Sequence, residues 1–131
     1  PDLEACRSGG LTIEAHTRTH PDLTALSDAR IHDEFEGCNE LIERRLGSRP
    51  RLLAYPYGYR DARVEALARP VYEAALTTRL AFVASTPDPV AIPRIDSYYL
   101  RHSPWREHPL RAATRAWLGM RSGLRRLAGG Q

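Results

Sequence analysis

Short apolar runs alternate with amphipathic stretches along the first hundred residues of this chain. One stretch carries five apolar residues at spacings of four, three, four and four, namely Ile31, Phe35, Cys38, Ile42 and Leu46. This spacing predicts one buried face of a helix. Ser27 is a suitable N-cap for that helix, and Gly47 is a suitable residue to end it.

The same patterns predict six further elements before residue 100. They are a helix ending near residue 8, strands over residues 11–13, 51–55, 72–78 and 91–99, and a helix over residues 61–69. Strands separated by helices of this length favour a parallel sheet with right-handed crossovers. We therefore expect an α/β fold, either an open sheet or part of a barrel.

A different pattern occupies the last thirty residues. Apolar residues recur there at helical spacing, with arginines on the other faces: Leu110, Ala113, Trp117, Met120, Leu124 and Leu127. We expect a domain over residues 1–100 and a basic amphipathic C-terminal helix within residues 101–131. Packing of this helix on the domain or on a second copy is favoured over attachment to a membrane surface.

The distribution of charge argues against a nucleic-acid partner. The chain has 131 residues, nineteen of them basic and sixteen acidic, and its length suits one domain. Residues 101–131 hold seven arginines and one acid, whereas residues 1–100 are slightly acidic. The predicted core region therefore lacks the basic patch that nucleic-acid binding requires. The sequence has no run of eighteen apolar residues and no signal-peptide pattern.

Cys6 and Cys38 are too few and too far apart in the sequence for a thiolate metal site. Two ordinary thiols are the favoured interpretation, although a disulfide between them is left open. His16 and His20 are better candidates for metal binding. Two imidazoles four residues apart at a strand end can converge on one divalent ion, but such a pair alone is also common without a ligand.

The surroundings of the histidines carry a more specific signal. The segment HTRTH, residues 16–20, is followed by an amphipathic helix, by LLAYPYG at residues 52–58, and later by YEAALTT and IPRI. Over residues 3–96 this order resembles the polysaccharide deacetylase family, also called the NodB-homology group or carbohydrate esterase family four. The match is to the variant in which a tyrosine replaces one of two paired prolines.

This resemblance implies a partial, distorted (β/α) barrel with its site at the carboxyl ends of the strands. It implies metal-assisted removal of N-acetyl groups from a polysaccharide or amino-sugar substrate, with His16 and His20 binding a divalent ion, most simply zinc. The backbone N–H of Tyr57 would donate to the oxyanion. The implied substrate contacts are Tyr55, Pro56, Gly58 and Arg94, with Tyr55 or Tyr59 stacking on a sugar.

The sequence differs from the family pattern at the positions of the family's acidic groups. The chain contains no Asp-Asp pair, which in the family supplies the base and the third metal ligand, and Ala54 stands where the family has an arginine. The later leucine–histidine motif is missing, so His102 and His108 remain unassigned as general acids. Asp22 is better explained as a turn residue than as a ligand.

We therefore expect an N-terminally truncated chain that is inactive by itself. The alternative function is a non-catalytic remnant of the same fold that binds carbohydrate or a protein partner.

Overall fold

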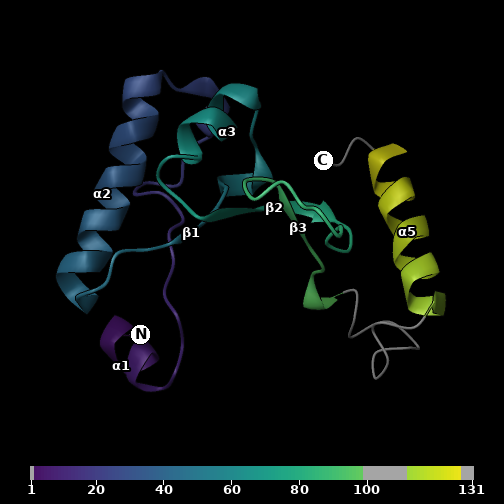
Figure 1. Cartoon of the computed structure of the whole chain (residues 1–131), viewed down its shortest axis with the longest axis horizontal. Coiled ribbons are helices and arrows are strands. Elements are labelled where there is room, and N and C mark those ends of the chain that lie inside the picture. Colours follow the sequence, from purple (N-terminus) through teal and green to yellow (C-terminus); the bar gives the residue numbers. More distant parts are fainter. Residues whose placement is uncertain (1, 99–111, 128–131) are drawn as a thin grey trace.

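The computed structural model describes residues 2–98 and 112–127, and Figure 1 shows their arrangement. The elements are α1 (Leu3–Ser8), η1 (Leu23–Ala25), α2 (Asp28–Leu46), β1 (Leu52–Ala54), η2 (Pro56–Gly58), α3 (Ala62–Ala68), β2 (Ala74–Leu80), β3 (Ile92–Arg94) and α5 (Ala112–Leu127). From α2 to β2 the long helices and the strands alternate, as the sequence predicts, and β3 follows β2 with no described helix between them.

The three strands form one parallel sheet in the order β1-β2-β3. Leu52 pairs with Ala74, and Leu76 pairs with Ile92. A further segment touches the outer edge of β1, where Ala15 forms a parallel bridge with Leu53. This parallel sheet, partly covered by helices, confirms the expected α/β class and fits a partial, distorted barrel.

Helix α2 supplies much of the core, and its five predicted apolar residues are all buried. They pack with residues of β1, β2 and α3 in one cluster. Gly47 ends α2 in the left-handed conformation, with φ of 70°, and its N–H donates to the Glu43 carbonyl at 2.8 Å. Figure 1 shows α2 and α3 on one side of the molecule and α5 beyond β2 and β3 on the other.

Two predicted strands differ from the structure. Residues 11–13 form no strand, because the N–H groups of Arg51 and Leu52 donate to the Glu14 carboxylate, at 2.7 and 2.8 Å, instead of to an upstream backbone. The strand expected over residues 91–99 stops at Arg94. The Asp96 carboxylate accepts the Tyr98 N–H at 2.8 Å, which begins a helical turn instead.

The C-terminal helix forms as predicted over most of its length and packs beside β2. The Arg115 guanidinium lies 4.5 Å from the centre of the Phe82 ring. The expected domain boundary near residue 100 and Leu110 lie outside the described residues. Cys6 and Cys38 are free thiols. No helix within residues 2–98 and 112–127 is long and apolar enough to span a membrane.

Candidate active site

His16 follows directly after the bridge that Ala15 makes with β1. The Ala15 N–H donates to the Leu52 carbonyl at 3.0 Å, and the Ala54 N–H donates to the Ala15 carbonyl at 2.9 Å. The histidine segment, the turn after β1, and the ends of β2 and β3 all follow parallel segments. They therefore gather at the carboxyl edge of the sheet, where barrels of this type carry their sites.

The rings of His16 and His20 lie edge to face, with 4.7 Å between their centroids. The Nδ1 atom of His16 lies 2.7 Å from the Ala54 carbonyl oxygen. Because a carbonyl only accepts, Nδ1 carries the proton and donates it, which leaves the Nε2 lone pair of a neutral His16 available to a metal. The structure thus brings the two predicted ligands together and orients one of them.

The loop between the two histidines is held by Glu34 of α2. Its carboxylate accepts the N–H groups of Arg18 and Thr19, at 2.9 and 2.8 Å, and the Thr19 hydroxyl at 2.7 Å. Thr17 and His20 adopt positive φ of 62° and 59°, and the Thr17 hydroxyl oxygen accepts the His20 N–H at 3.1 Å. The loop is therefore fixed in an uncommon backbone shape.

Glu34 is only 2% exposed, yet it remains an acceptor. Burial by itself raises the pKa of this carboxyl group. The hydrogen bonds from Thr19 and Arg18, together with the positive charge of Arg18, outweigh burial and hold the pKa below its usual value. Glu34 is not among the residues that the sequence motifs single out, although its position between Ile31 and Phe35 on the apolar stripe of α2 indicates burial.

The turn after β1 presents Tyr57 beside the histidines. The Tyr57 ring lies 4.5 Å from the His20 ring and 5.5 Å from the Tyr59 ring, measured between centroids. Tyr57 adopts a positive φ of 58°. Within the part of the chain that the structure describes, its backbone N–H has no hydrogen-bond acceptor.

Gly58 is required by this turn for two reasons. Its φ is 78°, and a Cβ atom at this position would overlap the hydroxyl oxygen of Thr78 on β2. Pro56 and Gly58 are both buried. Their contribution is therefore to shape the backbone that carries Tyr57, and a substrate would meet the exposed rings of Tyr57 and Tyr59 instead.

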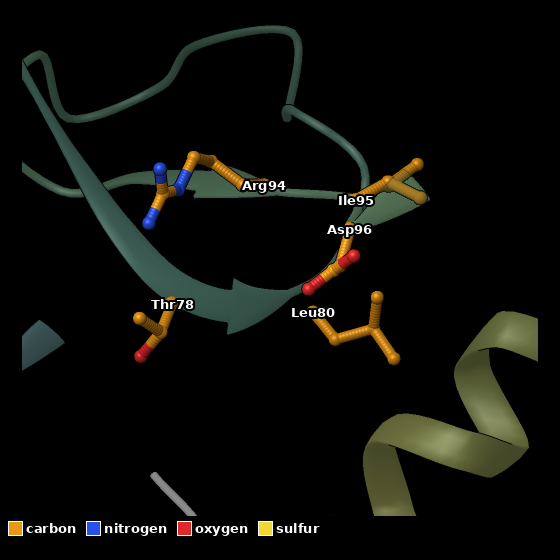
Figure 2. A pocket seen from close by; sticks show the side chains of 5 residues that line it. All are labelled: Thr78, Leu80, Arg94, Ile95 and Asp96. Carbon is orange, nitrogen blue, oxygen red and sulfur yellow. The ribbon is translucent and has the colours of Figure 1, made fainter. Parts of the chain in front are cut away.

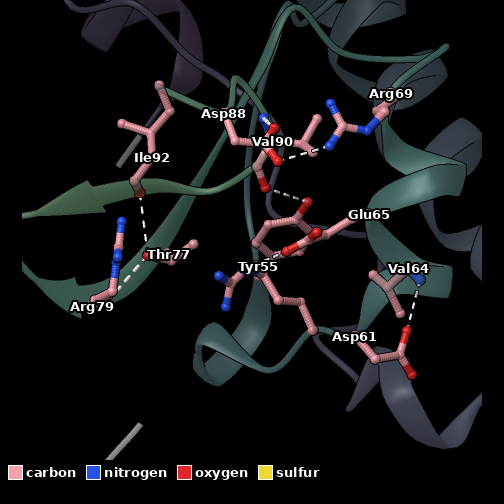
Figure 3. A network of polar contacts seen from close by, with 11 residues as sticks. Tyr55, Asp61, Val64, Glu65, Arg69, Thr77, Arg79, Asp88, Val90 and Ile92 are labelled. Atoms are coloured by element: carbon pink, nitrogen blue, oxygen red, sulfur yellow. Dashed lines mark hydrogen bonds and ion pairs between the residues drawn. The ribbon is translucent and has the colours of Figure 1, made fainter. Parts of the chain in front are cut away.

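Tyr55 lies in the core, so the expected sugar contact does not fit its position. Its side chain is 1% exposed, and its hydroxyl donates to the Val90 carbonyl at 2.9 Å (Figure 3). The same figure shows the Asp88 carboxylate, which accepts from Arg69 at 2.8 Å and from the Val90 N–H at 3.1 Å. Burial raises the pKa of the Tyr55 phenol, which stays neutral. Tyr55 therefore ties β1 to the loop before β3.

Arg94 lines a pocket of about 300 Å³ at the carboxyl ends of β2 and β3 (Figure 2). The other lining residues are Thr78, Leu80, Ile95 and Asp96. The Arg94 Nε–H donates to the Thr77 carbonyl at 2.8 Å, which restrains the side chain at the pocket wall. Thr78 joins this pocket to the Tyr57 turn through its contact with Gly58.

The histidine pair fits two positions of a divalent-metal site. Among the described residues no group of three or more histidine, cysteine or acidic side chains could hold a metal ion, so the pair has no third ligand there. Asp22 does not supply it, because its carboxylate accepts the N–H and hydroxyl of Thr24 as the cap of η1, at 2.9 and 2.6 Å. His102 and His108 lie outside the described residues.

Comparison with known proteins gives one consistent set of similarities. A family model described as polysaccharide deacetylase matches residues 1–72. The protein YlxY of Bacillus subtilis (strain 168) is 35% identical over 60 residues, which are 45% of this chain and 19% of that protein.

Solved structures are similar over a larger part of the chain. The polysaccharide deacetylase BC0361 from Bacillus cereus is 26% identical with a TM-score of 0.61, over 70% of this chain and 29% of that one. The Streptococcus pyogenes deacetylase PplD, in complex with acetate, is 22% identical with a TM-score of 0.67, over 71% and 42%. BA3943 from Bacillus anthracis, a CE4 family pseudoenzyme, is 22% identical with a TM-score of 0.54, over 60% and 28%. The chain thus spans less than half the length of each of these proteins.

Proposed function

Because this chain belongs to the polysaccharide deacetylase family, we propose that it supplies the histidine half of the active site of a carbohydrate N-deacetylase. The observation that carries the proposal is the His16–His20 pair, with rings 4.7 Å apart and His16 oriented by the Ala54 carbonyl. The reaction would be hydrolysis of the carbon–nitrogen bond of an N-acetyl group on a polysaccharide or amino sugar.

His16 and His20 would hold a divalent metal ion, and zinc is the first candidate because neutral imidazole suits it. A metal bound there would polarise the acetamido carbonyl and make a water molecule more acidic. The hydrogen bond from His16 to Ala54 fixes the tautomer and the ring before any ion arrives. Glu34 restrains the loop between the two proposed ligands, because its carboxylate accepts the N–H groups of Arg18 and Thr19.

The Tyr57 N–H would donate to the oxygen that gains negative charge during hydrolysis. A backbone donor without an acceptor of its own, held in a fixed turn beside His20, suits this role because it needs no rearrangement. Gly58 and Thr78 lock that turn. This chain would therefore stabilise the negative charge on that oxygen with a backbone N–H group and not with a mobile side chain.

The substrate would lie along the carboxyl edge of the sheet. Exposed rings of Tyr57 and Tyr59 offer apolar faces of the kind that pack against sugar rings. The neighbouring pocket offers the Arg94 guanidinium and the Thr78 hydroxyl as polar contacts. A sugar unit adjacent to the acetylated one would fit this pocket.

These 131 residues do not contain the Asp-Asp pair that the family uses as base and third ligand. No described acid stands near enough to complete the histidine pair. We therefore expect the chain alone to bind metal weakly and to release no acetate. The same observation favours a second candidate, a non-catalytic member that binds carbohydrate or a protein partner through this edge.

Zinc binding by the purified chain, measured by titration calorimetry, tests the proposal. The double variant His16→Ala/His20→Ala should lose binding, whereas His32→Ala, an exposed histidine on α2, should keep it. Equal zinc binding by all three proteins would contradict the metal site. Retained binding to N-acetylglucosamine oligomers without any zinc binding would favour the second candidate.

A further inference from the structure

The C-terminal helix α5 has its apolar and polar sides reversed relative to an ordinary surface helix. Successive side chains lie about 100° apart around a helix, so residues four apart share a face. The side facing the rest of the chain contains Thr114, Leu118 and Ser122, all buried. Two of these three residues are polar, which is unusual for the packed side of a helix.

The opposite side of α5 is exposed and has no charged residue. We call it the outer face of α5, and it consists of Ala112, Ala113, Ala116, Gly119, Met120, Gly123, Leu124 and Leu127. Met120 is 58%, Leu124 54% and Leu127 88% exposed. A continuous apolar strip of this kind on a surface marks a contact with another apolar phase.

Arg115 and Arg121 of α5 lie away from the outer face. The Arg115 guanidinium lies over Phe82, and the Arg121 guanidinium lies 5.6 Å from the Trp117 ring. Both arginines are exposed, and Trp117 is half-buried at the border of the outer face. The helix contains four arginines and no acid. Cationic residues beside an apolar face, with a tryptophan at the border, are typical of helices that lie in a membrane interface.

We propose that the outer face of α5 docks onto an anionic lipid surface, with the helix lying parallel to that surface. Leu124, Met120 and Leu127 would enter the acyl boundary, and the arginines would contact lipid phosphates. The sequence alone favours packing of this helix over membrane contact. In the structure, packing and membrane contact are compatible. Helix α5 packs on β2 through one side and exposes its apolar side.

The charge of the C-terminal residues favours an anionic lipid surface over a second copy of the chain as the partner of the outer face of α5. Residues 101–131 carry seven arginines and one acid, so two copies meeting through α5 would repel each other. An anionic bilayer attracts the same charge, because each arginine near its surface interacts favourably with the negative headgroups. Residues 1–100 are slightly acidic and are therefore repelled by an anionic lipid surface. This repulsion favours an orientation in which α5, and not the remainder of the chain, faces the lipid.

Vesicle flotation of the full 131-residue chain tests this proposal. The chain should float with phosphatidylcholine vesicles that contain phosphatidylglycerol, should not float with phosphatidylcholine alone, and should be released by high salt. Leu124→Glu should weaken binding by roughly tenfold or more, because it replaces a buried leucine by a charge. Leu41→Glu is the matched control, since Leu41 is 44% exposed on α2, and should bind like the wild type.

Three results would overturn the proposal. They are absence of flotation with the anionic vesicles, equal binding to both lipid mixtures, and equal loss in the two glutamate variants. Circular dichroism of both variants should match the wild type, because each leucine is exposed. Concentration-dependent dimers in sedimentation, without vesicle binding, would assign the outer face to a second copy instead.

Discussion

Glu34 accepts two hydrogen bonds from Thr19, one from its backbone N–H at 2.8 Å and one from its hydroxyl at 2.7 Å. Thr19 directly precedes His20, so a buried acid on α2 sets the position of the second predicted metal ligand. The carboxylate does not lie in the site itself. It acts through the backbone of the loop that joins the histidines.

Replacing Glu34 should therefore damage both stability and metal binding. In Glu34→Ala, the N–H groups of Arg18 and Thr19 lose their acceptor, and we expect unfolding to become easier by about 3 kcal/mol. Zinc affinity should fall roughly tenfold or more, as expected for loss of a group that orients ligands. Urea unfolding and calorimetry measure the two effects. Glu40→Ala, an exposed change on the same helix, should alter neither.

The pH dependence of stability should carry a contribution from Glu34. Its pKa is lowered in the folded chain, so its stabilisation is complete above the unfolded value and is lost as the pH falls through the folded pKa. The unfolded carboxyl titrates near 4.5. Between pH 6 and values well below that point, the wild type should lose more stability than Glu34→Gln. Parallel curves for the two proteins would show that Glu34 does not contribute.

Gly58→Ala should destabilise the chain more than Gly47→Ala. Both glycines have positive φ, 78° and 70°, so both variants bear the same backbone cost of about 1 kcal/mol. Only at Gly58 does the new methyl group meet Thr78, which we expect to add roughly 2 kcal/mol of strain. Thermal unfolding of the two variants separates these effects, and equal losses would mean that the turn can move away from β2.

Tyr55→Phe should weaken the fold without changing zinc affinity. The substitution leaves the Val90 carbonyl without its donor inside the core, at a cost of about 1–2 kcal/mol. Tyr59→Phe is the control, because Tyr59 is exposed and should change stability by less than about 0.5 kcal/mol. A loss of zinc binding in Tyr55→Phe would instead place Tyr55 in the site.

Periodicity was enough to predict α2, because its apolar residues repeat over about four turns and its ends carry recognisable cap residues. It was not enough for residues 11–13, where an apolar run looks like a strand but Glu14 takes the hydrogen bonds that pairing would need. The pattern also gave no means to separate Tyr55 from Tyr59. Tyr55 directly follows β1 and enters the core, whereas Tyr59 follows η2 and is exposed, and this difference is set by the tertiary packing.

The residues of the candidate site differ in how far the sequence predicts them. The sequence predicts roles for His16, His20 and Tyr57 because the spacing of their motifs can be recognised without a structure. Glu34 escapes notice, since an acid on a helix usually faces solvent, and only its position on the apolar stripe indicates burial. The orientation of His16 by Ala54 has no sequence signal, because any residue has a carbonyl.

The hydrogen bond between His16 and Ala54 joins residues 38 apart in the chain. Such a contact forms only after the intervening helix and turn have closed a long loop, and non-local contacts of this kind arise late in folding. The short segment HTRTH therefore does not assemble the oriented pair by itself. During refolding, the weak zinc binding proposed for this pair should lag behind helix formation, so that bound zinc would report completed tertiary structure.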